Sequence, residues 1–390
     1  MTDRTGLKNR GYTHSDVDER RGAAEEYTGV GLENISKFCF DPKEASRNIE
    51  NMIGAVQIPL GFAGPVMIAG EYAQGEFLVP LATTEGALVA SVSRGMSVMT
   101  ASGGVRTCVF GDYMTRAPVF RVRDLAHGIQ VSEWTETHMN ALRAAVAGTT
   151  SHGSLHSVKF FHTGRGLYMR LQFETGDAMG MNMVTVASEA VCRLIEKETG
   201  AVTVSVSGNM CSDKKAAAVN MIEGRGKTVV AETRIPGKTV EEKLHTTVDA
   251  MVEVCVRKDL VGSSLAATMG ANAHAANMVA ALYIATGQDP AHVVGGSMTL
   301  TTCENTDGDL YMSVRMPAVE VGTVGGGTSL PCQSEALDML GCKGDGKTRK
   351  LAEIVAATVL AGELSVTAAQ AAGQLGTAHS ELGRGNGCQS

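Results

Sequence analysis

Apolar positions between residues 117 and 207 repeat with strand spacing in some segments and with helix spacing in others. In chain order, the pattern predicts a strand at 119–122, a helix at 131–147, strands at 157–161 and 168–173, a helix at 181–198 and a strand at 202–207. This order is that of the ferredoxin-like split βαβ motif. The pattern therefore predicts one compact ferredoxin-like module within a longer chain.

The segments on either side of this module have different patterns. Residues 1–50 are charged and weakly patterned, which predicts a small helical segment or an oligomerisation arm. Residues 51–84 alternate apolar runs with proline and glycine breaks, as strands and turns do, and residues 85–101 have helical spacing. A long Ala/Leu/Val helix is predicted over residues 349–372. The whole pattern indicates an α+β fold in which the module is inserted into a larger domain.

Composition narrows the classes of function. The 390 residues are 44% hydrophobic and 19% charged, as in an ordinary globular protein. A net charge of −7 argues against nucleic acid as the main partner, because there is no basic excess to displace counterions. Nine cysteines without a C-x-x-C pair indicate neither a disulfide framework nor a zinc site, which favours a reducing compartment. The sequence has no uninterrupted apolar run of membrane length, and its charged start is unlike a secretory signal.

The segment Asp177–Met183 runs from a strand end into the predicted helix 181–198. Gly180 allows a ligand to approach the backbone closely, and the helix start offers N–H groups to an anion such as a diphosphate. Asn182 can donate and accept hydrogen bonds. The same residues also suit a helix end padded with methionine, which fills cores well.

Two lysines follow the unusual segment that starts at Ser207. The spacing predicts that Ser212 caps a helix over residues 216–222 and that Lys214 and Lys215 lie in its first turn. The helix dipole repels positive charge there, so a lysine would suit stabilisation of a developing oxyanion. Solvated surface lysines are the alternative interpretation.

Further polar groups occur at predicted element ends. Glu85 lies at a strand-to-helix junction and could act as an acid, and Asp289 could orient a lysine or carry a raised pKa. Residues 272–277 place polar groups on an apolar helix, where they need partners. The loop 322–328 suits contact with a phosphate or nicotinamide, or is merely a tight turn. His379, in the tail, would by default be a surface histidine.

Two formal motifs have the wrong context. Gly341–Thr348 satisfies the P-loop pattern, but residues 334–340 before it are predicted to be helical, whereas a phosphate-binding loop follows a buried strand. His152 and His156 have ligand spacing but lack a paired third metal ligand.

Taken together, these motifs resemble those of the 3-hydroxy-3-methylglutaryl-coenzyme A (HMG-CoA) reductase family over nearly the whole chain. The resemblance rests, in chain order, on Glu50–Pro65, Leu81–Gly86, Asp177–Met183, Ser207–Lys215, Asn272–Asn277, Gly287–Pro290 and Gly322–Thr328. Met181 matches the class I pattern, where class II enzymes usually carry alanine. We therefore expect a soluble catalytic form of class I.

The resemblance implies a large HMG-CoA-binding domain around a long central helix, an inserted ferredoxin-like NADP(H)-binding domain and a small helical N-terminal segment. The expected boundaries are 1–50 for the N-terminal segment, 51–116 with 208–390 for the large domain, and 117–207 for the small domain. The resemblance also implies a cis peptide near Ser205–Asp213 and a homodimer or homotetramer with active sites between subunits.

The implied activity is the two-step NADPH-dependent reduction of (S)-HMG-CoA to mevalonate and free coenzyme A, in isoprenoid and sterol biosynthesis. Lys214 would neutralise the oxyanion that forms from the thioester, and Glu85 would be a proton donor with a raised pKa. His379 would protonate the expelled coenzyme A thiolate. Asp289 would bridge Glu85 and Lys214 and so position both.

The resemblance also assigns binding residues. The expected cofactor contacts are Asp177, Met179, Gly180, Met181, Asn182, Thr150, Ser151, Gly322 and Thr323. The expected substrate contacts are Arg116, Ser207, Lys215 and Asn277 for the hydroxymethylglutaryl group and Lys258 and Arg94 for coenzyme A. Where animal enzymes carry Ser-Arg-Phe to bind the 2′-phosphate of NADPH, this chain has Thr150-Ser151-His152, so that guanidinium is absent.

The expected ligands are HMG-CoA, coenzyme A and mevalonate, with statin-like molecules as candidate inhibitors; neither a metal nor a membrane span is expected. The expected location is the cytoplasm, or alternatively the mitochondrial matrix after loss of a leader. Two other functions remain open. A coenzyme A-dependent acyltransferase or lyase could use the same lysine and histidine without a hydride donor, and a kinase could use residues 341–348.

Overall fold

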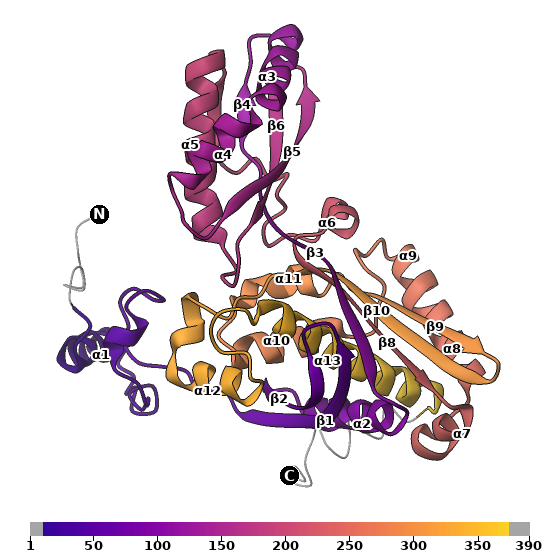
Figure 1. Cartoon of the computed structure of the whole chain (residues 1–390). Helices are drawn as coiled ribbons and strands as arrows, with labels where there is room; N and C mark the ends of the chain where they lie inside the picture. The colour runs from indigo at the N-terminus through magenta and orange to yellow at the C-terminus, as the bar shows by residue number, and fades with distance from the viewer. Residues whose placement is uncertain (1–10, 374–390) are drawn as a thin grey trace.

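The computed structural model describes residues 11–373 of the chain. Figure 1 shows a small module standing on a larger body, with the N-terminal helix α1 to one side. The chain is a mixture of helices and strands, and the predicted α+β class is confirmed.

A ten-stranded sheet runs through both bodies in the order β7-β4-β6-β3-β8-β10-β9, with β1, β2 and β5 paired beside this path. The strands of the larger body are β1 (Leu60–Gly70), β2 (Gln74–Ala82), β3 (Val105–Arg116), β8 (Gly226–Ile235), β9 (Leu300–Thr306) and β10 (Asp309–Val319). The alternating burial along β10 and β8 places one face of each strand against the core.

Strand β3, which is 12 residues long, belongs to both bodies. Residues 106–113 pair with β8 of the larger body, and Met114–Arg116 then pair with Leu171–Phe173 of strand β6 in the module. One continuous strand therefore joins the two bodies (Figure 1).

Helix α13 (Thr348–Ala371) forms the centre of the larger body. It is apolar on nearly all sides, as expected of a helix surrounded by protein. It is also the one described helix long and apolar enough to cross a membrane, but 94% of that apolar window is buried inside the protein. Helix α2 (Leu88–Ala101) packs closely against it, because a Cβ on Gly95 would lie 2.0 Å from the carbonyl oxygen of Ala361.

Two fully buried glutamates of α13 bind loops of the larger body. The carboxylate of Glu353 accepts hydrogen bonds from the N–H groups of residues 71–73 at 2.6–3.1 Å. The carboxylate of Glu363 accepts from the N–H groups of residues 273–274 and from Oγ1 of Thr301, each at 2.8 Å. A buried carboxylate requires such partners, so the two glutamates fix the position of these loops against the central helix.

The remaining segments of the larger body are short. They are α6 (Ala218–Glu223), α7 (Gly237–Thr239), η2 (Val240–Leu244), α8 (Val248–Val254), η3 (Cys255–Gly262), α9 (Ser263–Leu265), α10 (Ala275–Ala285), η4 (Pro290–His292), α11 (Val293–Gly296), η5 (Gly326–Ser329) and α12 (Pro331–Met339).

The module has its own apolar core and the predicted ferredoxin-like arrangement. Its elements are β4 (Val119–Arg121), α3 (Leu125–Thr137), α4 (Met139–Ala147), β5 (Ser154–Thr163), β6 (Gly166–Glu174), α5 (Met181–Thr199) and β7 (Val202–Ser205). The single helix predicted over residues 131–147 is wrong, because the chain forms two helices that meet at His138. The backbone of His138 is not helical (φ −112°, ψ 26°), and its N–H bonds to carbonyls of α3.

The N-terminal segment forms a small helical unit, as predicted. Helix α1 (His14–Thr28) begins with a capping box between Thr13 and Asp16, and η1 (Pro42–Ala45) follows it. The buried guanidinium of Arg20 donates to the carbonyls of Met52 (2.7 Å) and Gly11 (2.9 Å). The unit is thus held together largely by one arginine and a few apolar contacts.

The cis peptide expected near Ser205–Asp213 is not found. Within residues 11–373 the cis peptide is Gly64–Pro65, and the 205–213 segment instead turns through the positive φ angles of Asn209 and Ser212.

Candidate active site

The centre of the candidate site is an ion pair between Lys214 and Asp289. The Nζ atom of Lys214 lies 2.7 Å from Oδ2 of Asp289. Lys214 belongs to the loop between β7 and α6, and Asp289 to the turn between α10 and η4. The side chains are 43% and 33% exposed, so the pair is open to a ligand and the ammonium is not buried.

Lys214 does not lie in the first turn of a helix, as its spacing predicts. Helix α6 begins only at Ala218, and the hydroxyl of Ser212 donates to the carbonyl of Asn209 instead of capping it. Lys214 has a left-handed backbone (φ 54°), as do Asn209 and Ser212. Non-glycine residues in this region are strained and are often found at functional sites. The turn, and not a helix dipole, therefore determines the position of the lysine.

Asp289 is a carboxylate held at two points. It accepts a hydrogen bond from the N–H of Ala291 (3.0 Å) as the N-cap of η4. Partial burial pushes the pKa of Asp289 upward, but the hydrogen bonds from Lys214 and Ala291 outweigh it and leave the pKa below its usual value. Asp289 thus orients a lysine, the first of the two roles considered for it, and does not carry a raised pKa.

Glu85 precedes helix α2 and is exposed. Its Oε1 accepts a hydrogen bond from Nδ2 of Asn277 (3.1 Å), which also lies 3.3 Å from Nδ1 of His274. Among the described hydrogen bonds and ion pairs, Glu85 is thus joined to Asn277 and not to Asp289. The expected bridge by Asp289 is therefore present on the side of Lys214 only.

The expected substrate contacts near Lys214 gather around Asp213. Arg116, at the end of β3, has its guanidinium 3.7 Å from Oδ2 of Asp213, and Nζ of Lys215 donates to the carbonyl of the same residue (3.1 Å). The hydroxyl of Ser207 lies 3.6 Å from Sγ of Cys211. Two cations therefore gather at Asp213, the residue before Lys214 in the chain, a composition that suits binding of a carboxylate.

Arg94 and Lys258 both lie against the C-terminal half of α13. Arg94 donates to Oγ (3.0 Å) and to the carbonyl (2.5 Å) of Ser365, and burial lowers its pKa. Lys258 pairs with Asp259 (2.6 Å) and lines, with Gln370 and Ala371, a pocket of about 490 Å³. Arg94 therefore has an evident structural role in joining α2 to α13.

The segment resembling a P-loop binds a carboxylate of the same chain. The N–H groups of Gly346 (2.6 Å), Lys347 (3.0 Å) and Thr348 (3.2 Å) donate to Asp177, as does the hydroxyl of Thr348. Burial raises the pKa of Asp177, but these hydrogen bonds outweigh it and lower the pKa below its usual value. The segment follows helix α12, as predicted. Its N–H groups already bind the carboxylate of Asp177 in place of a phosphate.

The start of helix α5 is free to bind an anion. Gly180 (φ 93°) precedes it without a side-chain cap, and a Cβ there would lie 2.5 Å from Cγ2 of Thr175. The adjacent loop lies close, because a Cβ on Gly322 would be 2.7 Å from the backbone nitrogen of Met179, and the N–H of Thr323 donates to the carbonyl of Asp177 (2.9 Å). Asn182 is exposed at this helix start. The expected cofactor loops thus lie together and fit a diphosphate-bearing cofactor.

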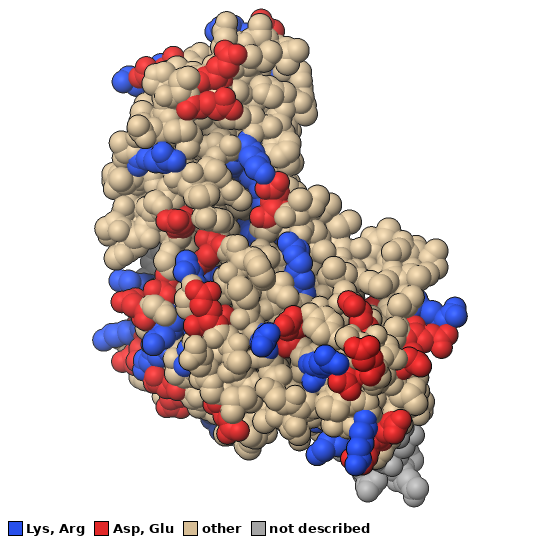
Figure 2. Space-filling view, turned by 45° about the vertical axis from the view of Figure 1, so that its right-hand side comes forward, with Lys and Arg blue, Asp and Glu red and all other residues tan. Residues whose placement is uncertain are grey.

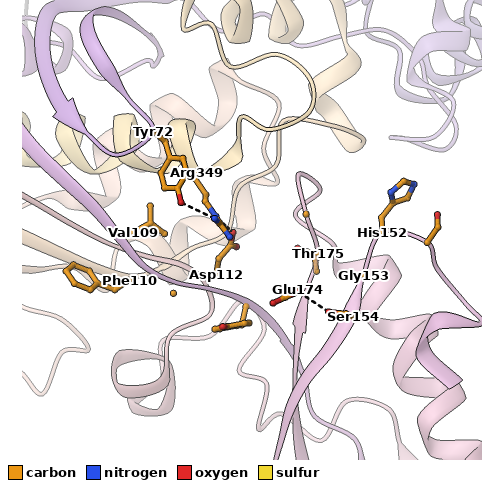
Figure 3. A pocket seen from close by; sticks show the side chains of 14 residues that line it. Tyr72, Val109, Phe110, Asp112, His152, Gly153, Ser154, Glu174, Thr175 and Arg349 are labelled. Atoms are coloured by element: carbon orange, nitrogen blue, oxygen red, sulfur yellow. Dashed lines mark hydrogen bonds and ion pairs between the residues drawn. The ribbon is translucent and has the colours of Figure 1, made fainter. Parts of the chain in front are cut away.

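A pocket of about 590 Å³ opens between the module and the larger body (Figure 3). Ser151 and His152 line one side, while Thr150 donates its hydroxyl to Sδ of Met183 (3.1 Å). Arg349 lines the opposite side and donates to Asp112 (3.0 Å) and to the hydroxyl of Tyr72 (3.0 Å).

Lysine, arginine and carboxylate side chains are intermingled over the larger body on the face in Figure 2.

Several site residues escape prediction from the sequence. Arg349 begins the long helix and shares no motif with residues 150–152, which it faces across the pocket. Asp213 is part of the Ser207–Lys215 motif and could have been singled out as the shared partner of the cations. Within the described residues, there is no group of three histidine, cysteine or acidic side chains that could hold a metal ion.

Comparisons with known proteins give a single family. The family model described as hydroxymethylglutaryl-coenzyme A reductase matches residues 16–384. The 3-hydroxy-3-methylglutaryl-coenzyme A reductase of Methanothermobacter thermautotrophicus is 52% identical over 378 residues, which cover 95% of each chain. That of Pyrococcus abyssi is 54% identical, over 94% of this chain and 92% of its own.

A solved structure shares the fold. The class II reductase of Streptococcus pneumoniae, bound to NADPH in open conformations, has a TM-score of 0.70 at 19% identity and covers 90% of this chain and 86% of its own. The class I assignment expected from Met181 is corrected, because the relatives that match over nearly the whole chain are archaeal enzymes and the solved neighbour is a class II enzyme. Met181 has a local structural role, because its Sδ accepts a hydrogen bond from Arg225 (2.8 Å), and one such position does not define a class.

Proposed function

The chain belongs to the hydroxymethylglutaryl-coenzyme A reductase family, an oxidoreductase family of the mevalonate pathway, and we propose that Lys214, Asp289, Glu85 and His379 carry out its reduction of HMG-CoA with NADPH as the donor. The ion pair between Lys214 and Asp289 is the observation on which this proposal mainly rests.

Lys214 is the electrophilic group of the proposed site. Negative charge develops on the thioester oxygen as the carbonyl is reduced, and an ammonium already in place stabilises it without reorganisation. Asp289 orients the lysine, because its carboxylate accepts a charge-assisted hydrogen bond from the ammonium at 2.7 Å. The partial exposure of the pair leaves room for the substrate oxygen beside Nζ.

Glu85 is the proposed proton donor for reduction of the aldehyde intermediate. The amide of Asn277, which donates to it at 3.1 Å, would hold the carboxyl group toward the substrate. His379 lies outside the described residues, so its role rests on the sequence motif alone. It would protonate the coenzyme A thiolate when the hemithioacetal collapses.

The cofactor is proposed to bind between the module and the larger body, held by the start of α5 and the loops at 150–151, 177–182 and 322–323. When bound, it supplies the hydride for each of the two reductions. The neighbour's structure with NADPH supports the choice of the phosphorylated cofactor. In this chain, Arg349 offers positive charge at the pocket that His152 also lines, where the guanidinium of animal enzymes is missing.

The remaining assignments concern binding and assembly. Arg116, Ser207, Lys215 and Asn277 are proposed to bind the hydroxymethylglutaryl group, with Arg94 and Lys258 near coenzyme A. Residues 117–207 would form the cofactor domain, and residues 51–116 with 208–390 the substrate domain of a homodimer or homotetramer. Similarity to archaeal enzymes favours the cytoplasm, and the comparisons lend no support to a mitochondrial location.

Substitution of the lysine tests this proposal. Lys214→Ala should lower kcat by about 100- to 1,000-fold, which is the usual effect of removing one group that stabilises an oxyanion. Lys159→Ala is the matched control, since Lys159 is a 49% exposed lysine paired with Glu223 at 2.5 Å, and it should leave kcat unchanged. The assay follows loss of nicotinamide absorbance on addition of HMG-CoA, with NADPH and NADH compared. A near-normal rate in Lys214→Ala, with an intact fold, would reject the proposed role.

A further inference from the structure

Asp289 has a second neighbour on its buried side. His292 is fully buried, and its Nε2 lies 3.6 Å from Oδ2 of Asp289, the same oxygen that pairs with Lys214. This Nε2 atom has no hydrogen-bond partner, although it is shielded from solvent. Buried polar atoms are rarely left without a partner, so this atom needs an explanation.

The other nitrogen of His292 leads back to the lysine. Its Nδ1 contacts the buried carboxylate of Glu320, which also contacts the buried guanidinium of Arg225. Arg225 in turn donates to Oδ1 of Asp213 at 3.0 Å. Since Asp213 and Lys214 are adjacent in sequence, these contacts form a closed ring. The ring consists of Lys214, Asp289, His292, Glu320, Arg225 and Asp213.

The hydrogen on Nε2 of His292 follows from the group that this atom faces. Nε2 faces the carboxylate of Asp289, and an ionised carboxylate only accepts hydrogen bonds. Asp289 is held in its ionised form by Lys214 and Ala291. If Nε2 carried no hydrogen, its lone pair would face a carboxylate oxygen with nothing between them. A hydrogen on Nε2 resolves this conflict, and a shortening of about 0.5 Å would bring the two atoms within hydrogen-bond distance.

We propose that His292 is a positioning residue for the reduction: through Nε2–H it holds the carboxylate of Asp289 from the buried side and so determines where the ammonium of Lys214 points. This inference rests on the function proposed above. Glu320 fixes the imidazole from the other nitrogen, and Arg225 balances the charge of Glu320. His292 therefore acts through Asp289 and does not touch the substrate.

Two substitutions distinguish the contact that Nδ1 of His292 makes with Glu320 from the contact that Nε2 makes with Asp289. His292→Asn keeps an amide near the Nδ1 position and so retains the contact with Glu320 but not that with Asp289. His292→Gln places its amide near the Nε2 position and retains the contact with Asp289 but not that with Glu320. If the ring had a purely structural role, the Gln variant would be affected at least as much, because it leaves the buried Glu320 with one partner fewer.

The expected result is a difference in kcat between the two variants. His292→Asn should lower kcat by about 10- to 100-fold with KM for HMG-CoA unchanged, because a small misplacement of a catalytic group is costly. His292→Gln should keep kcat near that of the wild type. An Asn variant at least as active as the Gln variant would overturn the inference.

A second substitution tests whether His292 acts through Asp289. In an Asp289→Asn background, His292→Asn should cause no further loss of kcat, whereas independent effects would add. Full additivity would overturn the inference. The outcome is distinct from failure of the proposed function. An active Lys214→Ala enzyme rejects both proposals, whereas an inactive Lys214→Ala enzyme alongside a fully active His292→Asn enzyme rejects only the role of His292.

A measurement that needs no substitution at His292 covers the case in which the His292 variants do not fold. In nitrogen-15 NMR of histidine-labelled protein, the imidazole whose signal moves in Asp289→Asn identifies His292, and the Nε2 atom of this imidazole should be protonated. An unprotonated Nε2 for that imidazole would overturn the inference.

Discussion

The two buried glutamates of α13 allow a paired test of stability and catalysis, in which substitution of Glu353 is the control for substitution of Glu363. Glu353 and Glu363 are both fully buried, and each accepts three hydrogen bonds. They differ in location, since Glu363 binds Ala273 and His274 beside the candidate site, whereas Glu353 binds the β1–β2 turn. Glu363→Gln and Glu353→Gln should therefore destabilise the protein equally but affect catalysis unequally.

The magnitude follows from the hydrogen bonds. Glutamine has one acceptor oxygen, and its amide NH2 group replaces the second oxygen of the carboxylate. At each site, at least one of the three donors therefore faces this NH2 group and loses its hydrogen bond. A hydrogen bond to a charged group contributes about 1.5–3 kcal/mol, and an unsatisfied buried donor costs about 1–3 kcal/mol. We expect each variant to lower the free energy of unfolding by about 2–4 kcal/mol.

Only Glu363→Gln should also lower kcat. It loosens the segment that carries Asn277, whose amide holds Glu85. Urea unfolding should be followed by far-UV circular dichroism, because the single tryptophan, Trp134, lies in the module and would not report on α13. Equal losses of kcat in the two variants, or an unchanged unfolding midpoint in either, would refute this reasoning.

Two further predictions concern packing and pH. Gly95→Ala should destabilise the protein by more than about 1–3 kcal/mol in thermal unfolding, because its Cβ would overlap the carbonyl of Ala361 on the facing helix; Gly22→Ala, in the open helix α1, should be neutral or slightly stabilising. Since the pKa of Asp177 is lower in the folded than in the unfolded state, its carboxylate stabilises the fold above its ordinary pKa of 3.8 and this contribution is lost as pH falls through the folded-state value. Asp177→Asn should therefore reduce the acid dependence of stability below about pH 4, and an unchanged acid profile would contradict the assigned hydrogen bonds.

Much of the fold was predictable because each element carries its own pattern. The alternation in residues 119–122 and 168–173 and the apolar run after Arg349 correspond to β4, β6 and α13. The break at His138 was not predictable, because helical spacing continues across it and only the non-helical backbone separates α3 from α4.

The candidate site was predictable where its residues lie in motifs, and not where pairing depends on the fold. Lys214 and Asp289 stand in separate motifs that the structure brings together. His292, Glu320 and Arg225 carry no local signal, because their roles arise only when the end of β10 and the turn after α10 approach each other. The turn at Lys214 was mistaken for a helix because the serine before it matches a helix cap.

Because strand β3 pairs with strands of both the larger body and the module, its length fixes the strand register of both. Side chains alternate between faces along a strand, so one residue inserted between Tyr113 and Met114 would reverse either the residues that pair with β8 or those that pair with β6. Arg116 would then turn away from Asp213. Insertions should therefore accumulate in the surface loops of this chain while the length of β3 is held constant, because neither half can adjust its register without the other.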